Sequence, residues 1–314
     1  MNNKILVIVG PTAVGKTYVS IELAKKFNTE IISADSMQVY KYMDIGTAKV
    51  TEEEACGIKH HMLDLVYPNE EFSVSEFQKI AEKHIDNLID NDKLPIVIGG
   101  SGLYVNSLLY GLDFGKVKSD EKVKKYYTYF YNENGTEKLH ELLVNVDSEA
   151  AAKIHKNNVK RVIRALEVCH ITGKKFSEMN TDIRKPSEKY NCIIIGLEMD
   201  RDILYQRINK RVDIMVENGL IEEVKSLLDK GYDRNLVSLQ GIGYKEIIDY
   251  LEGKTTKQDA INILKTNTRR FAKRQFTWFK ADSNIKWFDL TNLDKIDKVI
   301  NSIYDYTLGG LSNE

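Results

Sequence analysis

Cysteine is scarce in this chain of 314 residues. Its three cysteines, Cys56, Cys169 and Cys192, are odd in number and far apart in the sequence. They indicate neither the disulfide framework of a small secreted domain nor a cysteine-based zinc cluster. This usage is typical of a reducing compartment, and we expect the protein to be cytoplasmic.

The chain also lacks a large net charge and a long hydrophobic run. Lys and Arg number 45 and Asp and Glu 46, so no bulk field attracts a polyanion, and nucleic acid could bind only at local basic clusters. No apolar run approaches the roughly 18 residues of a membrane-spanning helix. The apolar run at 5–9 is too short for a secretory signal. We therefore expect no membrane partner.

Proline (4) and glycine (19) are spread thinly, without a linker or a repeat. Apolar runs predict buried strands at 5–9, 30–34, 95–98 and 192–197, and helical periodicity is strongest at 17–27 and 73–90. Residues 116–190 are rich in Lys, Glu, Tyr and Asn and contain no strand-like run. We therefore predict an α/β core with a parallel sheet and a helical C-terminus, from residues 1–115 and 191–314, and an all-helical insertion domain at 116–190.

A phosphate-binding loop is indicated at residues 10–17, where Gly-Pro-Thr-Ala-Val-Gly-Lys-Thr fits G-x-x-x-x-G-K-[ST] between a predicted strand and a predicted helix. The glycines let successive backbone N–H groups point at one anion, and the helix N-terminus adds partial positive charge. Lys16 supplies a charge for a terminal phosphate, and Thr17 a hydroxyl for Mg²⁺ or phosphate. The motif predicts a P-loop NTPase-like core that binds a polyphosphate, without naming the molecule.

Asp35 follows the second predicted strand, at the edge where doubly wound sheets bind ligands. It could hold Mg²⁺, act as a general base, or simply close a turn, and its position alone leaves these roles open. The pair His60-His61 is reminiscent of metal ligands. Since adjacent side chains point apart, we interpret both histidines as structural.

A series of motifs in order is more specific than the P-loop alone. They are D-S-M-Q-V-Y at 35–40, M-D-I-G-T-A-K at 43–49, H-H-M-L-D at 60–64, G-G-S-G-L-Y at 99–104, R-A-L-E-V at 164–168, G-I-G-Y-K-E at 241–246 and K-R-Q-F-T-W-F at 273–279. With the P-loop, this series closely resembles the tRNA dimethylallyltransferases of bacterial type, also called tRNA isopentenyltransferases, over residues 4 to about 288. The resemblance implies transfer of a dimethylallyl group from its diphosphate to N6 of the adenosine immediately 3′ of the anticodon, in tRNAs that read codons beginning with U.

The resemblance also implies roles for individual residues. The diphosphate site would be formed by Gly10, Pro11, Thr12, Ala13, Val14, Gly15, Lys16 and Thr17. Lys16, Thr17 and Arg211 would act on the leaving group together with Mg²⁺, which Thr17 would bind. Arg207, one turn before Arg211, is an alternative for the second cation. Asp35 would accept the proton of the adenine amine late in the attack, because an ordinary aspartate is a weak base.

The tRNA, through its anticodon stem-loop, would contact three parts of the chain. Around the target base the resemblance implies Asp35, Ser36, Met37, Gln38 and Ser101. In the insertion it implies Lys160, Arg161, Val162, Ile163 and Arg164. Near the C-terminus, residues 265–280 hold six basic residues and no acid, and Lys265, Arg269 and Lys273 form an i, i+4, i+8 stripe suited to RNA phosphates.

Three alternatives remain open on the residues alone. A P-loop kinase of a small metabolite would explain residues 10–17 and Asp35, but not the basic C-terminal helix. An adenylate isopentenyltransferase would not need the long insertion, and a non-catalytic RNA-binding protein would not need the P-loop. No pattern sets the oligomeric state, and we expect a monomer.

Overall fold

The computed structural model describes residues 3–110, 119–179 and 186–312, which divide into two compact units. The first unit comprises Met1–Leu109 and Ser187–Glu314, and the second comprises Tyr110–Pro186. The expected boundary after residue 115 lies outside the described residues. No helix among the described residues is long and apolar enough to cross a membrane.

The first unit is built on a six-stranded sheet in the order β3-β2-β4-β1-β5-β6, in which all neighbouring strands are parallel. The strands are β1 (Lys4–Val9), β2 (Ile31–Ser33), β3 (His60–His61), β4 (Ile96–Gly99), β5 (Asn191–Glu198) and β6 (Lys286–Asp289). The central strand β1 is buried along its whole length, as its unbroken apolar run requires. This sheet confirms the predicted α/β core.

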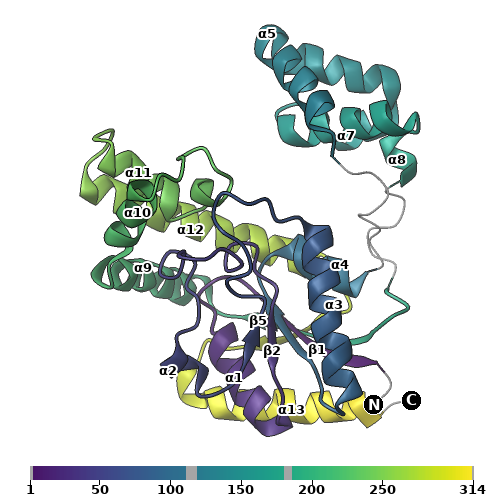
Figure 1. Ribbon diagram of the computed structural model, residues 1–314. Helices are drawn as coiled ribbons and strands as arrows, with labels where there is room; N and C mark the ends of the chain where they lie inside the picture. Colours follow the sequence, from purple (N-terminus) through teal and green to yellow (C-terminus); the bar gives the residue numbers. More distant parts are fainter. Residues whose placement is uncertain (1–2, 111–118, 180–185, 313–314) are drawn as a thin grey trace. The chain divides into compact units, whose positions relative to one another are not determined.

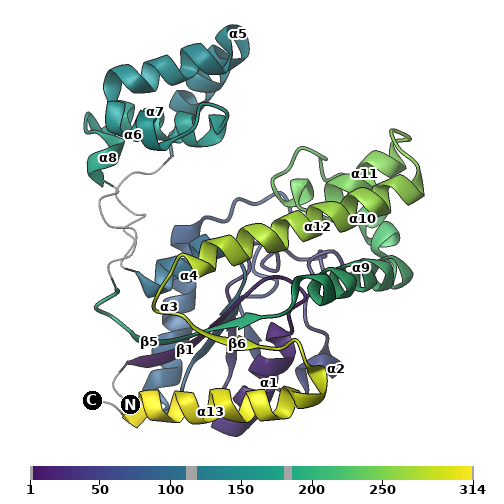
Figure 2. The same ribbon diagram turned by 180° about the vertical axis from the view of Figure 1, so that it is seen from behind.

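Helices cover both faces of the sheet. Those nearest to it are α1 (Lys16–Phe27), α3 (Val74–Asp90), α4 (Gly102–Leu109) and α13 (Ile296–Ser312), with the short α2 (Glu52–Ala55) beside them. Helices α1 and α13 lie on one face, and α3 and α4 on the other (Figures 1 and 2). The described part of this unit also contains two 3₁₀ turns, Ser238–Gln240 and Leu293–Lys295.

A second apolar core lies among the C-terminal helices. These are α9 (Arg201–Glu217), α10 (Leu220–Asp229), α11 (Tyr244–Leu251) and α12 (Lys257–Lys280). Their buried side chains pack with Val39, Tyr40 and Met43 from the segment after β2. This core therefore joins the C-terminal helices to the segment that carries the D-S-M-Q-V-Y motif.

The second unit is helical over its described residues. It contains α5 (Glu121–Val146), α6 (Ser148–Lys153), α7 (Val159–Thr172) and α8 (Phe176–Met179). Helix α5 is interrupted at Gly135, where φ is 79°, so that two helices follow one another. The core of this unit includes Leu139, Leu143, Val162 and Leu166. A β-bridge joins Tyr110 to Pro186, where the chain enters and leaves the unit.

Candidate functional site

Three neighbouring strands end at the candidate site. The P-loop follows β1, Asp35 lies two residues after β2, and Ser101 lies two residues after β4. Because β2, β4 and β1 are parallel neighbours, their carboxyl ends meet at one edge of the sheet. The hydroxyl of Ser101 accepts a hydrogen bond from the Ser36 N–H (3.0 Å) and donates to the Ser36 hydroxyl (3.2 Å). The topology therefore brings together three motifs that are far apart in the sequence.

The P-loop has the backbone that an anion cradle requires. Gly10, Ala13 and Gly15 have φ of 151°, 64° and 113°, and Gly15 caps the N-terminus of α1. Such left-handed positions are strained for alanine and readily adopted by glycine. The Lys16 ammonium crosses back over the loop and donates to the carbonyl oxygens of Gly10 (2.9 Å) and Pro11 (2.8 Å). The loop is thus curled around its own lysine at a helix N-terminus.

Two side chains from the C-terminal helices hold this loop from outside. The Thr12 N–H donates to Oε1 of Gln275 on α12 (2.8 Å), and Nε of Arg207 on α9 donates to the Ala13 carbonyl (2.9 Å). Arg207, the alternative cation for the diphosphate, is therefore bonded to the loop backbone. Arg211 has no hydrogen bond to any residue that the structure describes.

Electrostatics place Lys16, Arg211 and Asp35 in one neighbourhood. The pKa of Lys16 is lowered to about 7, chiefly by burial and also by the nearby Arg211, while Asp35 acts in the opposite direction. Burial likewise lowers the pKa of Arg211, Arg207 adds to this, and Glu54 and Asp35 favour its charged form. Both side chains are only partly exposed, and two basic groups that repel one another are suited to an anionic ligand, which would relieve the repulsion.

Asp35 has one oxygen committed to the backbone. Its Oδ1 accepts from the Met37 N–H (2.8 Å), and among the described residues nothing bonds its Oδ2. The Thr17 hydroxyl is exposed and likewise makes no hydrogen bond within the described chain. The described residues contain no cluster of three His, Cys, Asp or Glu side chains that could hold a metal ion. These groups fit Mg²⁺ only where a ligand's phosphates and water supply most of the coordination, which is common for this ion.

Gln38 is bonded within the chain at both ends of its amide. Its Oε1 accepts from the Ser33 hydroxyl (2.9 Å), and its Nε2 donates to the carbonyls of Thr47 (3.2 Å) and Ala48 (3.1 Å). It could read a base only by exchanging these bonds. Its contact with tRNA stays a prediction.

A carboxylate clamp holds the M-D-I-G-T-A-K segment. The Glu223 carboxylate on α10 accepts from the N–H groups of Asp44 (2.8 Å), Ile45 (2.7 Å) and Gly46 (3.0 Å), and from the Tyr244 hydroxyl (2.8 Å). Three successive N–H groups converging on one carboxylate form an anion nest. The clamp therefore fixes residues 43–49 to α10 and α11. The same segment supplies the carbonyl groups to which the Gln38 amide donates.

The basic residues of α12 lie on two sides of the helix. Lys265 pairs with Asp213 of α9 (2.6 Å), and Arg269 donates to Asn209 of α9 (2.6 Å). Lys273 is exposed, and so are its neighbours Arg270 and Arg274. The first two members of the expected stripe therefore face α9, and only the third faces solvent. The expected tRNA contacts of all three stay predictions.

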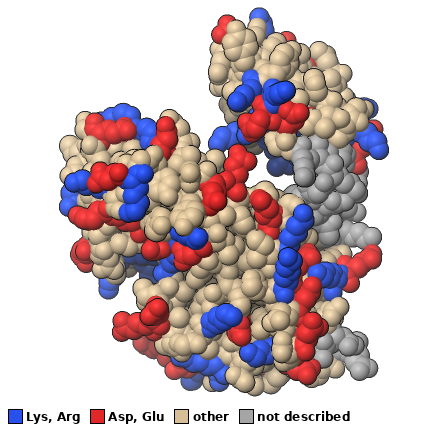
Figure 3. Space-filling model, in the orientation of Figure 1, with Lys and Arg blue, Asp and Glu red and all other residues tan. Residues whose placement is uncertain are grey.

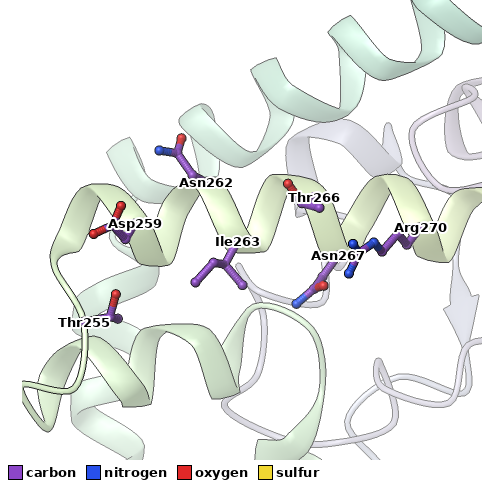
Figure 4. Close-up of a pocket in the computed structure, with 7 residues that line it drawn as sticks. All are labelled: Thr255, Asp259, Asn262, Ile263, Thr266, Asn267 and Arg270. Atoms are coloured by element: carbon purple, nitrogen blue, oxygen red, sulfur yellow. The ribbon is translucent and has the colours of Figure 1, made fainter.

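The exposed side of α12 borders a polar pocket (Figure 4). It is lined by Thr255, Asp259, Asn262, Ile263, Thr266, Asn267 and Arg270. Acidic and basic side chains are interspersed over the visible face of the molecule (Figure 3), in keeping with the net charge of −1. A polyanion would therefore find positive charge only at individual exposed side chains on this face or near the pocket, of which Arg270 is one.

In the helical unit, the predicted α7 residues differ in exposure. Lys160 and Arg161 are exposed, whereas Val162 is fully buried and Ile163 is 9% exposed. Arg164 pairs with Glu167 (2.7 Å), a buried carboxylate of the same helix. RNA could reach positions 162 and 163 only through their backbone.

The two histidines point apart, as expected for neighbours on a strand. His61 pairs with Glu30 (2.6 Å), and Nδ1 of His60 lies 2.9 Å from the Ile58 carbonyl. Nε2 of His60 is buried and has no hydrogen-bond partner among the residues that the structure describes. Burial lowers the pKa of His60, so the neutral form is favoured.

Sequence reasoning did not single out Gln275, Glu223 or Tyr104. Gln275 lies inside the K-R-Q-F-T-W-F motif, which marked this part of the chain as a candidate for function. Its hydrogen-bond partners Thr12 and Gly100 are 263 and 175 residues away, so the motif alone does not predict what Gln275 contacts. Tyr104 is 7% exposed, and its pKa is raised by burial and by the nearby Tyr40 and Asp35. Tyr104 therefore stays neutral, close enough to Asp35 for the two groups to interact electrostatically.

Comparison with known proteins shows the family of this chain. Residues 38–282 match the family model described as IPP transferase. Proteins named tRNA dimethylallyltransferase from Alkaliphilus oremlandii and Clostridioides difficile are 54% and 52% identical, and each match covers 96% of both chains. The crystal structure of a full-length tRNA isopentenylpyrophosphate transferase from Bacillus halodurans is 48% identical, covers 98% of this chain and 97% of that one, and has a TM-score of 0.75. A eukaryotic dimethylallyltransferase described as acting on tRNA is 33% identical, with a TM-score of 0.80 over 96% of this chain and 77% of that one. The chain therefore belongs to the IPP transferase family, whose relatives here are tRNA dimethylallyltransferases.

Proposed function

We propose that this protein transfers a dimethylallyl group from dimethylallyl diphosphate to N6 of the adenosine immediately 3′ of the anticodon, in tRNAs that read codons beginning with U. The observation that carries the proposal is the neighbourhood of Lys16, Arg211 and Asp35 beside the P-loop. Two half-buried basic side chains suit a diphosphate, and a carboxylate with one oxygen uncommitted within the described chain suits a base. The named relatives favour this activity over a metabolite kinase or an adenylate isopentenyltransferase.

In the proposed reaction the bond between C1 of the dimethylallyl group and its diphosphate oxygen breaks, and the electron pair leaves with the diphosphate. N6 of adenine forms the new bond to carbon and gives its proton to Asp35. Since Oδ1 of Asp35 holds the Met37 N–H, Oδ2 is the oxygen that receives it. Proton transfer comes late, because the positive charge on nitrogen develops as the C–N bond forms.

The leaving group carries the larger change in charge. The P-loop N–H groups, Lys16 and Arg211 would stabilise the departing diphosphate where its negative charge develops. We propose that Mg²⁺ binds there with the diphosphate and the Thr17 hydroxyl, and supplies Lewis-acid stabilisation of that charge. Arg207 would act indirectly, because its Nε holds the P-loop carbonyl of Ala13.

The RNA side of the proposal rests on exposed cations. On α12 these are Arg270, Lys273 and Arg274, and on α7 they are Lys160 and Arg161. The anticodon stem-loop would lie on these residues as the target base leaves its stack toward Ser36 and Ser101. We propose that the protein binds tRNA and dimethylallyl diphosphate as a monomer.

A transfer assay tests the proposal. The protein is incubated with Mg²⁺, dimethylallyl diphosphate labelled in its dimethylallyl group, and either an unmodified tRNA with adenosine after the anticodon or AMP. Label in tRNA, and none in a matched tRNA with guanosine at that position, is the expected result. Label in AMP would favour the adenylate isopentenyltransferase, and ATP turnover in a parallel incubation with ATP, without any label transfer, would favour a kinase.

A further inference from the structure

The side-chain amide of Gln275 lies between two strand ends of the site. Its Oε1 accepts from the Thr12 N–H in the P-loop (2.8 Å), and its Nε2 donates to the Gly100 carbonyl after β4 (3.0 Å). The residue is 6% exposed, so water replaces neither bond easily. An amide offers an acceptor and a donor on one planar group, and glutamate or methionine of similar length does not.

The amide lies so close to Gly100 that no side chain fits between them. A Cβ placed on Gly100 would lie 2.2 Å from Nε2 of Gln275, so residue 100 must be glycine while the amide keeps this position. Ser101, the next residue, is bonded to the backbone and hydroxyl of Ser36. A displacement of Gln275 would therefore move the P-loop relative to the pair Ser36–Ser101.

We propose that Gln275 is a positioning residue for the transfer reaction. It sets the distance between the diphosphate cradle and the segments after β2 and β4 that would hold the target base, and so aligns the breaking and forming bonds. The inference rests on the proposed function, since it names a further residue for the same site. A misplacement of reacting groups by about 1 Å can cost about 100-fold in rate.

The first test separates rate from RNA binding. We expect Gln275→Ala to lower kcat about 10- to 100-fold and to weaken inorganic diphosphate binding with Mg²⁺ several-fold, while the KM for tRNA stays within about twofold. Gln275→Glu keeps the shape and the acceptor for Thr12 but sets a buried carboxylate oxygen against the Gly100 carbonyl oxygen, so we expect kcat to fall at least as far as in Gln275→Ala. Gln258→Ala, an exposed glutamine at the start of the same helix, is the matched control and should behave like the unaltered protein.

The second test uses the contact with Gly100. Gly100→Ala alone should displace the amide and lower kcat about as much as Gln275→Ala. In the double variant the added methyl group fills the vacated space, so kcat should fall no further than in Gln275→Ala. Multiplicative losses, or a lowered melting temperature with kcat within twofold of normal, would overturn the inference. Diphosphate binding, measured by calorimetry, tests Gln275 even if the protein proves inactive on tRNA, so the two failures are distinguishable.

Discussion

Replacing Lys16 by methionine should change how the stability of the first unit depends on pH. The pKa of Lys16 falls from 10.5 to about 7 in the folded protein, chiefly because burial removes its ammonium group from water. Between these two values the unfolded chain binds a proton that the folded chain does not. The free energy of unfolding of the unaltered protein therefore contains a contribution that rises with pH across this window and is constant below pH 7.

The size of this contribution follows from the same shift. Near the middle of the window the slope is about 1.4 kcal/mol per pH unit for one proton. From pH 7.5 to 9.5 the free energy of unfolding of the unaltered protein should thus rise by about 2 kcal/mol relative to Lys16→Met, which lacks the titrating group. Titrating groups that do not interact with Lys16 contribute equally to both proteins and cancel in the difference.

Urea unfolding at pH 7.5, 8.5 and 9.5 measures the effect, with fluorescence as the signal. Both tryptophans, Trp278 and Trp287, lie in the unit that contains Lys16. Lys138→Met, on the exposed surface of the helical unit, is the control and should leave the pH dependence unchanged. Parallel curves for the unaltered protein and Lys16→Met would refute the burial of an uncharged Lys16 at alkaline pH.

Three further predictions concern the proposed reaction and its RNA. Asp35→Asn should keep tRNA affinity and lose several orders of magnitude in kcat, and near-normal turnover would remove Asp35 as the base. Glu223→Gln replaces the carboxylate that accepts from the N–H groups of residues 44–46 by a neutral amide. We expect the free energy of unfolding to fall by about 1–3 kcal/mol, and no loss would show that the clamp is dispensable. Arg270→Ala with Lys273→Ala should lower the salt slope of tRNA binding by about 1–2, and an unchanged slope would place these side chains outside the RNA interface.

The four inner strands of the sheet and the P-loop were predictable because their signals are local, whereas the short edge strands β3 and β6 were not predicted. An unbroken apolar run predicts a buried parallel strand, and the run at 5–9 corresponds to β1. The spacing of Gly10, Gly15 and Lys16 is imposed by the anion cradle itself, whatever surrounds it. Likewise, the end of β2 predicts where the Asp35 carboxylate lies, since carboxyl ends of parallel strands share one edge.

The supports of the site were not predictable in the same way. Thr12 and Gln275 are 263 residues apart, and Arg207 reaches the P-loop across 194 residues. Periodicity predicts that α9 and α12 are helices, but it does not predict which of their residues point at the loop. The role of Glu223 was equally hidden, because a glutamate in the first turn of a helix is ordinarily exposed to water and stabilised by the helix dipole. Nothing in the sequence therefore indicated that this carboxylate binds the backbone of residues 44–46.

The basic stripe of α12 illustrates why periodicity gives the face of a helix only approximately. A helix turns by about 100° per residue, so positions i, i+4 and i+8 drift by about 40° at each step. Lys265 and Arg269 still face α9, where Asp213 and Asn209 neutralise or bond them, while Lys273 has rotated into solvent beside Arg270. Lys265→Ala with Arg269→Ala should consequently lower stability and leave the salt slope of tRNA binding nearly unchanged, the reverse of the effect expected at 270 and 273. A steep loss of salt dependence in the inner pair would mean that α9 and α12 part to admit RNA.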